Sequence, residues 1–326
     1  MCRLVLIAVT LSTVPSLPRT TRGADTPAPV SGRSRERADE LKPADALART
    51  KLLIVHLEAI RIAMGRPKPP PSALKVRDAT ARESLFAAVN LRRRVAQLAF
   101  EQTRSNPEWR PPPGFTPSVG RVFELVDRTL VEVLRVKDAL GLRSPASESL
   151  EPDSTDHDML VAALFNAGGL VNILLDRGSS PGGSYDAITI AVHIALELHL
   201  ALVESKLPLA PEFSPNKTPT DVFERLLIVF EKIREIGAKA NMPVASLEAV
   251  KTKGVEHTPD DVSNVISLVI AELFWLHSLV EGAEQPVQGY SAGRKLPADA
   301  FQRAGLLIGL LDDLIRRTTA NDFKSG

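Results

Sequence analysis

The chain has 326 residues, enough for one large domain or two smaller ones with their own cores. Its 40 basic and 39 acidic residues give a formal net charge of +1, so no overall field favours nucleic acid or an acidic partner. Only 5% of the residues are aromatic, which disfavours base-stacking platforms and aromatic-lined sugar clefts.

The N-terminus has the pattern of an export signal. Arg3 precedes an apolar stretch, Leu4 to Val14, that is too short to span a bilayer, and cleavage sites follow Ser16 and Ala24. A buried N-terminal helix is the alternative interpretation. We expect residues 1–24 to be a signal peptide and the polar residues 25–40 to be a disordered leader. The protein would then be periplasmic or secreted and would not span the membrane after cleavage.

Cys2 is the single cysteine, and it lies inside the predicted signal. Cleavage would leave a mature chain without cysteine, which excludes disulfides, thiolate metal sites and iron–sulfur clusters. We therefore expect no cofactor of these kinds and no metal site, and a bacterial periplasm fits such a chain best.

A short proline-containing phrase recurs along the chain and predicts helix starts. In "TPTD" (from Thr218) and "TPDD" (from Thr258), the Thr is an N-cap, the Pro occupies the first helical position and the Asp completes a capping box. Related phrases begin at Pro43 and Pro297, and residues 43–62 and 297–316 share nine identities without gaps. We interpret this likeness as an internal duplication.

Long helices are predicted throughout the rest of the chain. Their starts fall near residues 43, 81, 117, 156, 185, 219, 259 and 297. Apolar residues then recur at 4-3-4-3 spacing, which is the seam of a helical bundle, for example Val222, Leu226, Val229, Ile233 and Ile236. We find no segment that reads as a strand.

This pattern predicts an all-α fold of about eight long antiparallel helices, arranged as helical-hairpin repeats or as two packed four-helix bundles. The loop Leu142–Ser154 is the most linker-like segment, and we expect it to separate an N-terminal half, residues 41–142, from a C-terminal half, residues 154–320. The helices near 156 and 185 are apolar nearly all round, which places them at the centre.

Two groups of polar residues in these apolar helices are candidates for a ligand site. Asn166 and Asn172 flank a glycine pair in "FNAGGLVN", where a ligand or another helix can come close; a simple helix–helix contact is the favoured alternative. His193 and Glu197 share one helix face, a spacing compatible with metal binding or proton transfer, although a buried histidine paired with a carboxylate is the more ordinary explanation.

Two further motifs have structural explanations. "RGSSPGGSYD" (Arg177 to Asp186) is Gly-rich but lacks a phosphate-binding pattern, so we expect a flexible hairpin loop. The basic run Arg92, Arg93 and Arg94 is expected on a solvated helix face. The sequence contains no G-x-S-x-G motif, Walker sequence or recognisable pair of catalytic carboxylates, and we assign no catalytic residue.

The sequence therefore favours an exported all-α repeat protein that acts as an interaction module or scaffold for a protein or peptide partner. The alternative is a ligand- or metal-binding helical bundle, with or without enzymatic activity, whose site lies at the central helices.

Overall fold

The computed structural model describes residues 41–70, 72, 74–104, 117–142, 156–175, 180–203, 206–250, 256–280, 293–319 and 322–323. Within these ranges 72% of the residues are helical, which confirms the all-α class with eight long helices. The elements are α2 (Pro43–Ala63), β1 (Leu74–Arg77), α3 (Ala81–Thr103), α4 (Val119–Ala139), α5 (His157–Leu174), α6 (Pro181–Leu202), α7 (Pro219–Lys239), β2 (Ser246–Ala249), α8 (Pro259–Ser278) and α9 (Pro297–Arg317). The predicted signal peptide, the leader and residues 143–154 of the predicted linker lie outside the described residues.

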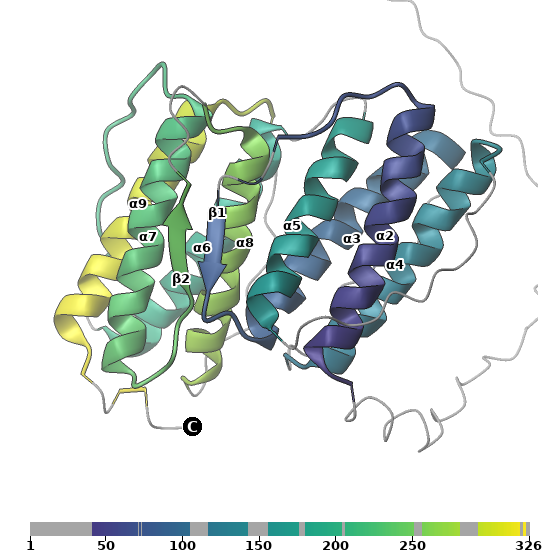
Figure 1. The fold of residues 1–326 in the computed structure, drawn as a ribbon. Helices are drawn as coiled ribbons and strands as arrows, with labels where there is room; N and C mark the ends of the chain where they lie inside the picture. Colours follow the sequence, from purple (N-terminus) through teal and green to yellow (C-terminus); the bar gives the residue numbers. More distant parts are fainter. Residues whose placement is uncertain are drawn as a thin grey trace, which may run out of the picture.

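The helices form two four-helix bundles that lie side by side (Figure 1). The first bundle contains α2, α3, α4 and α5, and the second contains α6, α7, α8 and α9. Because α5 packs against α2 and α3, the boundary between the bundles falls between Leu175 and Ser180 and not at the Leu142–Ser154 loop.

The repeated phrase starts helices as predicted. The backbone N–H of Asp221 donates to Thr218 Oγ1 (3.3 Å), and the carboxylate of Asp221 accepts from the Thr218 N–H (2.8 Å). Two backbone N–H groups that have no partner within the helix are thus satisfied. Thr258 and Asp261 make the same two bonds at the start of α8. Each phrase therefore has a local structural role.

Helix α6 begins earlier than expected. Its N-cap is Ser180, whose hydroxyl accepts from the Gly183 N–H at 3.3 Å, and its first helical residue is Pro181. Gly182 and Gly183, which we expected in a flexible loop, lie in the first turn of the helix. Ser180 and Pro181 are another N-cap followed by a proline at the first helical position. This start signal was missed because two glycines follow it directly.

The seam residues form the bundle cores. The residues that follow the 4-3-4-3 spacing in the last three helices are at most 2% exposed: Val222, Leu226, Val229, Ile233, Ile236, Val262, Ile266, Val269, Leu273, Leu276, Ala300, Ala304, Leu307, Leu311 and Leu314. Burial of these apolar stripes is the main favourable contribution to the fold.

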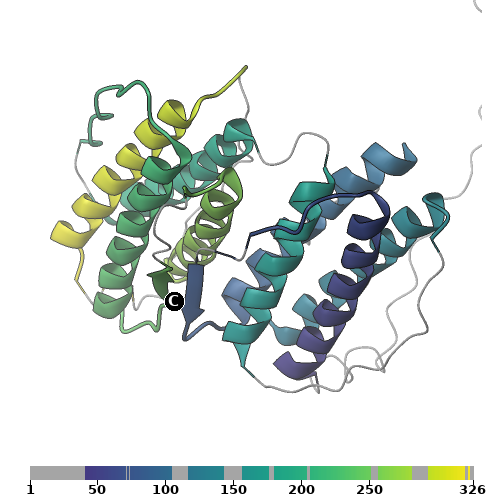
Figure 2. The same cartoon turned by 45° about the horizontal axis from the view of Figure 1, so that its top comes forward.

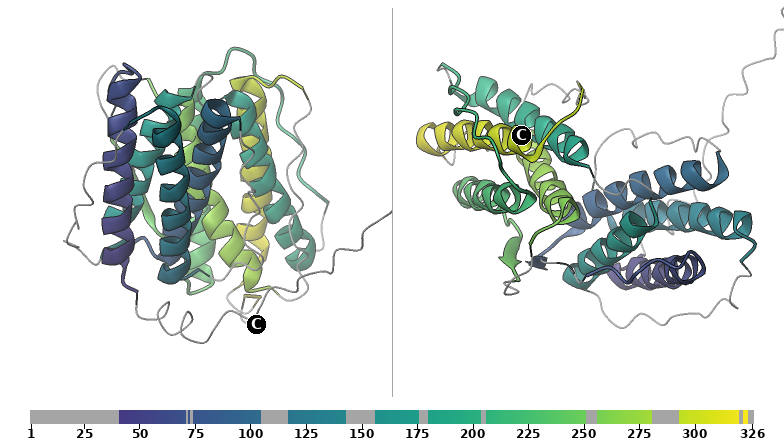
Figure 3. Two further views of the ribbon diagram at one scale, coloured as in Figure 1. Left: turned by 90° about the vertical axis from the view of Figure 1, so that its right-hand side faces the viewer. Right: turned by 90° about the horizontal axis from the view of Figure 1, so that it is seen from above.

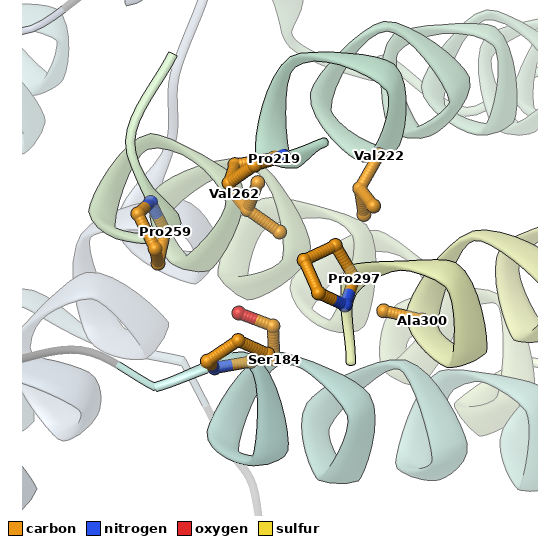
Figure 4. Close-up of a pocket in the computed structure, with 8 residues that line it drawn as sticks. Ser184, Pro219, Val222, Pro259, Val262, Pro297 and Ala300 are labelled. Carbon is orange, nitrogen blue, oxygen red and sulfur yellow. The ribbon is translucent and has the colours of Figure 1, made fainter. Parts of the chain in front are cut away.

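Within each bundle the helices run in the same direction. Near the starts of α7 and α9, Arg225 donates to the carbonyl oxygen of Phe301 (3.0 Å), and near their ends Lys239 donates to the carbonyl oxygen of Ile315. Figure 4 shows Pro219, Pro259 and Pro297 gathered at one end of the second bundle, and these prolines and Pro181 line a small apolar pocket.

The first bundle has the same arrangement. Arg49 of α2 pairs with Asp127 of α4, and further along both helices His56 Nδ1 lies 3.1 Å from Lys137 Nζ. Successive helices within a bundle are separated by 15 to 19 residues. At about 3.3 Å per residue this length is sufficient to return along a helix of about 32 Å, so parallel packing is sterically feasible.

Antiparallel packing occurs where the two bundles meet. Arg82 at the start of α3 lies 3.3 Å from Glu272 near the end of α8, and Arg94 further along α3 pairs with Asp260 at the start of α8. Figure 3 (right) shows the bundles meeting along these two helices. The helices that we expected at the centre, α5 and α6, lie instead within their own bundles.

A two-stranded ladder also joins the bundles, although the sequence analysis expected no strand. β1 follows α2, β2 follows α7, and the two pair antiparallel with Leu74 opposite Ala249 and Arg77 opposite Ser246 (Figure 2). Each strand has four residues, too few to give a recognisable alternation in sequence.

Candidate functional site

The four residues predicted for a ligand site are divided between the two bundles. Asn166 is exposed and Asn172 is half-buried on α5 of the first bundle, whereas His193 and Glu197 are half-buried on α6 of the second bundle. In the described part of the chain, no ion pair joins His193 and Glu197. The structure therefore does not bring the asparagines and the His–Glu pair together, and their role in binding stays a prediction.

The glycine pair between the two asparagines makes room for a contact between bundles. A Cβ atom on Gly168 would lie 3.3 Å from Arg94 Nη1, and one on Gly169 would lie 3.8 Å from Asp260 Oδ2 and from Pro69 Cβ. A simple helix–helix contact, the favoured alternative to a ligand site, therefore describes these two glycines. Arg94, which we expected in a solvated face, is 8% exposed because its guanidinium pairs with Asp260 across the junction.

A buried charged cluster lies at the other end of the α3–α8 contact. We call Arg82, Glu83 and Glu272 the junction cluster. Both carboxyl side chains are 0% exposed, and the Arg82 guanidinium lies 3.5 Å from Glu83 Oε1 and 3.3 Å from Glu272 Oε2. Arg82 Nη2 also donates to the carbonyl oxygen of Pro243 (2.7 Å), and its guanidinium lies 5.1 Å from the centroid of the Trp275 ring.

The two carboxyl groups of the junction cluster have opposite pKa shifts. Burial raises the pKa of Glu272 to about 9, and the hydrogen bond to Glu83 and its negative charge act in the same direction. Burial also raises the pKa of Glu83, but hydrogen bonds from Glu272 and Thr80 and the charge of Arg82 outweigh it, so the net shift is downward. At neutral pH the pair therefore holds one proton, on Glu272.

Only part of this cluster can be recognised from the sequence. Glu83 follows Thr80 by three residues, the spacing of a capping box, and it accepts from the Thr80 N–H (2.6 Å) and the Thr80 hydroxyl (2.8 Å). Glu272 was missed. The available signal was a single carboxylate inside the apolar run Val269–Leu276, directly beside a seam position.

Other buried polar groups lie inside the bundles. The buried histidine of α6 is His199, whose Nε2 lies 3.5 Å from Asp313 Oδ2 of α9, and not the predicted His193. Within the described ranges, no three His, Cys, Asp or Glu side chains form a group that could hold a metal ion.

Helices α5 and α6 have the length and apolar composition of membrane spans. In each, about half of the most apolar 18-residue window is buried in its bundle, 50% for α5 and 44% for α6, and core helices of a soluble protein meet the same criterion.

Three large exposed apolar residues of the second bundle, including Leu209, lie close together in sequence on its surface segment 206–218, which we call the strap. It follows α6 and leads into α7 along the outer side of the bundle, on the face away from the first bundle (Figure 1). Leu209 is 94% exposed, and Leu207 and Phe213 are 49% and 50% exposed. Such a group of large apolar side chains on one short segment is unusual on a protein surface and is typical of a binding surface.

Prolines and glycines hold the strap on α9. A Cβ atom on Gly305 would lie 2.7 Å from Pro211 Cγ, and one on Gly309 would lie 3.2 Å from Pro208 Cβ. The side-chain amide of Gln302 donates to the carbonyl oxygen of Pro211 (2.9 Å). The two prolines are three residues apart, the repeat of an extended polyproline helix, so they occupy the edge that faces α9.

The strap was not identified from the sequence, and the chain has other proline-rich segments elsewhere. "RPKPPPS" lies on the return from α2, where Pro69 packs close to Gly169, and "WRPPPGF" lies outside the described residues. The signal for the strap was a pair of prolines separated by apolar residues, "LPLAPEF".

Comparison of the chain with protein-family models, with curated proteins and with solved structures found no match.

Proposed function

We propose that this protein is an exported interaction module whose strap binds a protein partner through an apolar groove on that partner. The observation that supports the proposal is the exposure of Leu207, Leu209 and Phe213 on a segment that is itself anchored to α9. An anchored segment loses little conformational entropy on binding, so most of the free energy from burying these side chains is available for affinity.

The charge of the strap favours a protein groove over an anionic membrane. Lys206, Glu212 and Lys217 are its charged residues and give a net charge of +1. Binding to an anionic lipid surface requires a cluster of basic residues, since each contributes only about 1 kcal/mol. An apolar groove needs no such cluster, and the extended strap with prolines on its inner edge resembles the peptides that such grooves accept.

The experiment compares strap variants of the full-length chain in its native host. We expect a partner that copurifies in stoichiometric amounts with the wild-type chain and cross-links to a photoreactive residue at position 209. Leu209→Ser should weaken binding of the purified partner by about 10- to 100-fold, because a buried leucine contributes about 1.5–3 kcal/mol. The control is Ile62→Ser, which removes another exposed apolar side chain (68% exposed) from the first bundle.

Two outcomes would contradict the proposal that the strap binds a protein partner. If Leu209→Ser and Ile62→Ser bind every copurifying protein as well as the wild-type chain does, the strap is not the binding surface. If anionic vesicles bind the wild-type chain and the loss with Leu209→Ser is confined to vesicles, the strap is a membrane contact and the proposed protein partner is wrong.

The alternative, a ligand- or metal-binding bundle with a site at Asn166, Asn172, His193 and Glu197, makes a different prediction. Purified protein would then carry a stoichiometric metal or organic molecule, and replacing His193 or Glu197 would abolish its binding while the circular dichroism spectrum stays unchanged. Elemental analysis and mass spectrometry of the native protein test this directly.

A further inference from the structure

The junction cluster contains more acidic groups than basic ones in a place that water does not reach. One guanidinium, that of Arg82, contacts two carboxyl groups, Glu83 and Glu272, and both carboxyl side chains are fully buried. Two carboxylates in contact with each other cannot both stay ionised without a large cost in free energy. The cluster is electrically neutral when it holds one proton.

The hydrogen bonds identify the carboxyl group that carries this proton. Glu83 Oε2 accepts from the Thr80 N–H and hydroxyl, which stabilises its ionised form. Glu272 Oε1 accepts one longer bond, from the Ala245 N–H at 3.3 Å. Glu272 is therefore the partner that holds the proton, and the hydrogen bond between the two side chains shifts their pKa values in opposite directions.

The position of the cluster couples this proton to the contact between the bundles. Glu272 belongs to α8 of the second bundle, whereas Arg82 and Glu83 belong to α3 of the first bundle. Each bundle has its own apolar seam, so the two can separate at this end without unfolding. Separation would expose Glu272 to water, where its carboxyl group is ionised at neutral pH.

We propose that the junction cluster is a pH-dependent contact between the bundles, closed while Glu272 is protonated and opening as Glu272 loses its proton. The β1–β2 ladder opens with it, because the ladder lies directly beside the cluster in both bundles: β1 precedes α3, and Ala245 precedes β2. The Arg94–Asp260 pair at the far end of α3 and α8 carries no such shared proton and keeps the bundles joined.

The pH range follows from linkage. Glu272 has a raised pKa in the closed state, about 9 against an ordinary value of 4.5, so the closed state binds one proton more than the open state between these values. The contribution of the Glu272 proton to closing is fully present below pH 4.5. Above that, each pH unit raises the ratio of open to closed forms about tenfold until pH 9.

The other charged groups around Glu272 do not titrate in the alkaline part of this range. An arginine guanidinium keeps its charge throughout this range, and the negative charge of Glu83 is already present because its pKa is lowered. His157 of α5 also lies beside the cluster, with its Nδ1 3.0 Å from Oγ of Ser84, the residue after Glu83. Burial lowers the pKa of His157 below its ordinary value of 6.5, so its titration is complete before pH 8.

The experiment measures amide hydrogen exchange of the β1–β2 ladder between pH 6 and pH 9 in the full-length chain, after correction for the intrinsic pH dependence of exchange. We expect the ladder opening constant to rise about tenfold per pH unit in the wild-type chain, and to be independent of pH in Glu272→Gln, which keeps a hydrogen-bond donor toward Glu83. Glu231→Gln, at a side chain that is 59% exposed on α7, is the control and should behave as wild type.

Infrared spectroscopy of the wild-type chain gives a second measurement that needs no variant to fold. A protonated carboxyl group has a carbonyl stretch that carboxylates lack, and we expect this band at pH 7 and its loss as the pH rises through 9. The proposal is overturned if no such band is present, or if Glu272→Gln retains the wild-type pH dependence. It is also overturned if the amides of the α7 seam exchange with the same pH dependence as those of the ladder. Loss of the Glu272 proton would then be linked to global unfolding and not to separation of the bundles.

Discussion

The contact between α9 and the strap predicts the effect of a single methyl group. Gly305→Ala adds a Cβ atom that would lie 2.7 Å from Pro211 Cγ and 2.9 Å from Arg225 Nη1. Neither neighbour moves freely. The proline ring belongs to the strap backbone, and the Arg225 guanidinium donates to the carbonyl oxygen of Phe301 and lies 3.4 Å from the centroid of its ring.

The magnitude comes from two opposing contributions. Replacing glycine by alanine inside a helix stabilises it by about 1 kcal/mol. Inserting a methyl group into a filled space costs about 1–3 kcal/mol, and the strap can avoid this cost by moving off the helix. We therefore expect a change of less than about 1 kcal/mol in the global free energy of unfolding, together with a clear loss of order in the strap.

Gly309→Ala is the matched control on the same helix. Its Cβ atom would lie 3.2 Å from Pro208 Cβ and 3.4 Å from Pro208 Cγ, distances that a shift of a few tenths of an ångström relieves. The assay is limited proteolysis of the strap, combined with urea unfolding followed by circular dichroism. We expect faster cleavage between Lys206 and Lys217 in Gly305→Ala, and near wild-type cleavage with unchanged or raised stability in Gly309→Ala.

The reasoning would be refuted by equal cleavage rates in the wild-type chain and in Gly305→Ala. That result would mean that the strap is not held by close packing at Gly305. The same variant bears on the proposed function, because a displaced strap no longer presents Leu209 in an ordered position.

Three further predictions concern the fold. Thr258→Ala removes the cap of α8 and should lower the free energy of unfolding by about 1 kcal/mol in urea titrations. Phe223→Ala removes a fully buried ring and should cost about 3–5 kcal/mol by the same measurement; a cost below 1 kcal/mol would contradict its placement in the core. Hydrogen bonds from the Thr218 backbone and hydroxyl, followed by Lys217, lower the pKa of Asp221 to about 2. This contribution to stability is present above pH 4 and is lost as the pH falls toward 2, so Asp221→Asn should show a weaker acid dependence there, and an unchanged acid profile would contradict the capping role.

The helices themselves could be predicted because their signals are local. The Thr–Asp capping boxes at Thr218 and Thr258 mark the first residues of α7 and α8 correctly, and the seam spacing identifies the buried face of each. The start of α6 was predicted several residues too late. Gly182 and Gly183 are typical of loops, although Ser180 and Pro181 before them already form a helix cap.

The junction between the bundles could not be predicted in the same way. Glu272 and Glu83 are separated by more than 180 residues, and each looks ordinary in its own helix. Their opposite pKa shifts arise only because α3 and α8 pack together and exclude water from both carboxyl groups. The two short strands form for the same reason: the returns after α2 and α7 happen to lie side by side.

The amino-acid sequence by itself determined where most of the helices begin and which face of them is buried, since a cap and a seam depend on residues within one or two turns. Only the tertiary structure decided that helices within a bundle run parallel, that α3 meets α8, and that Leu209 is left in solvent. A connection of 15 to 19 residues is long enough for either direction of the next helix, so the choice depends on how the apolar surfaces of distant segments fit together.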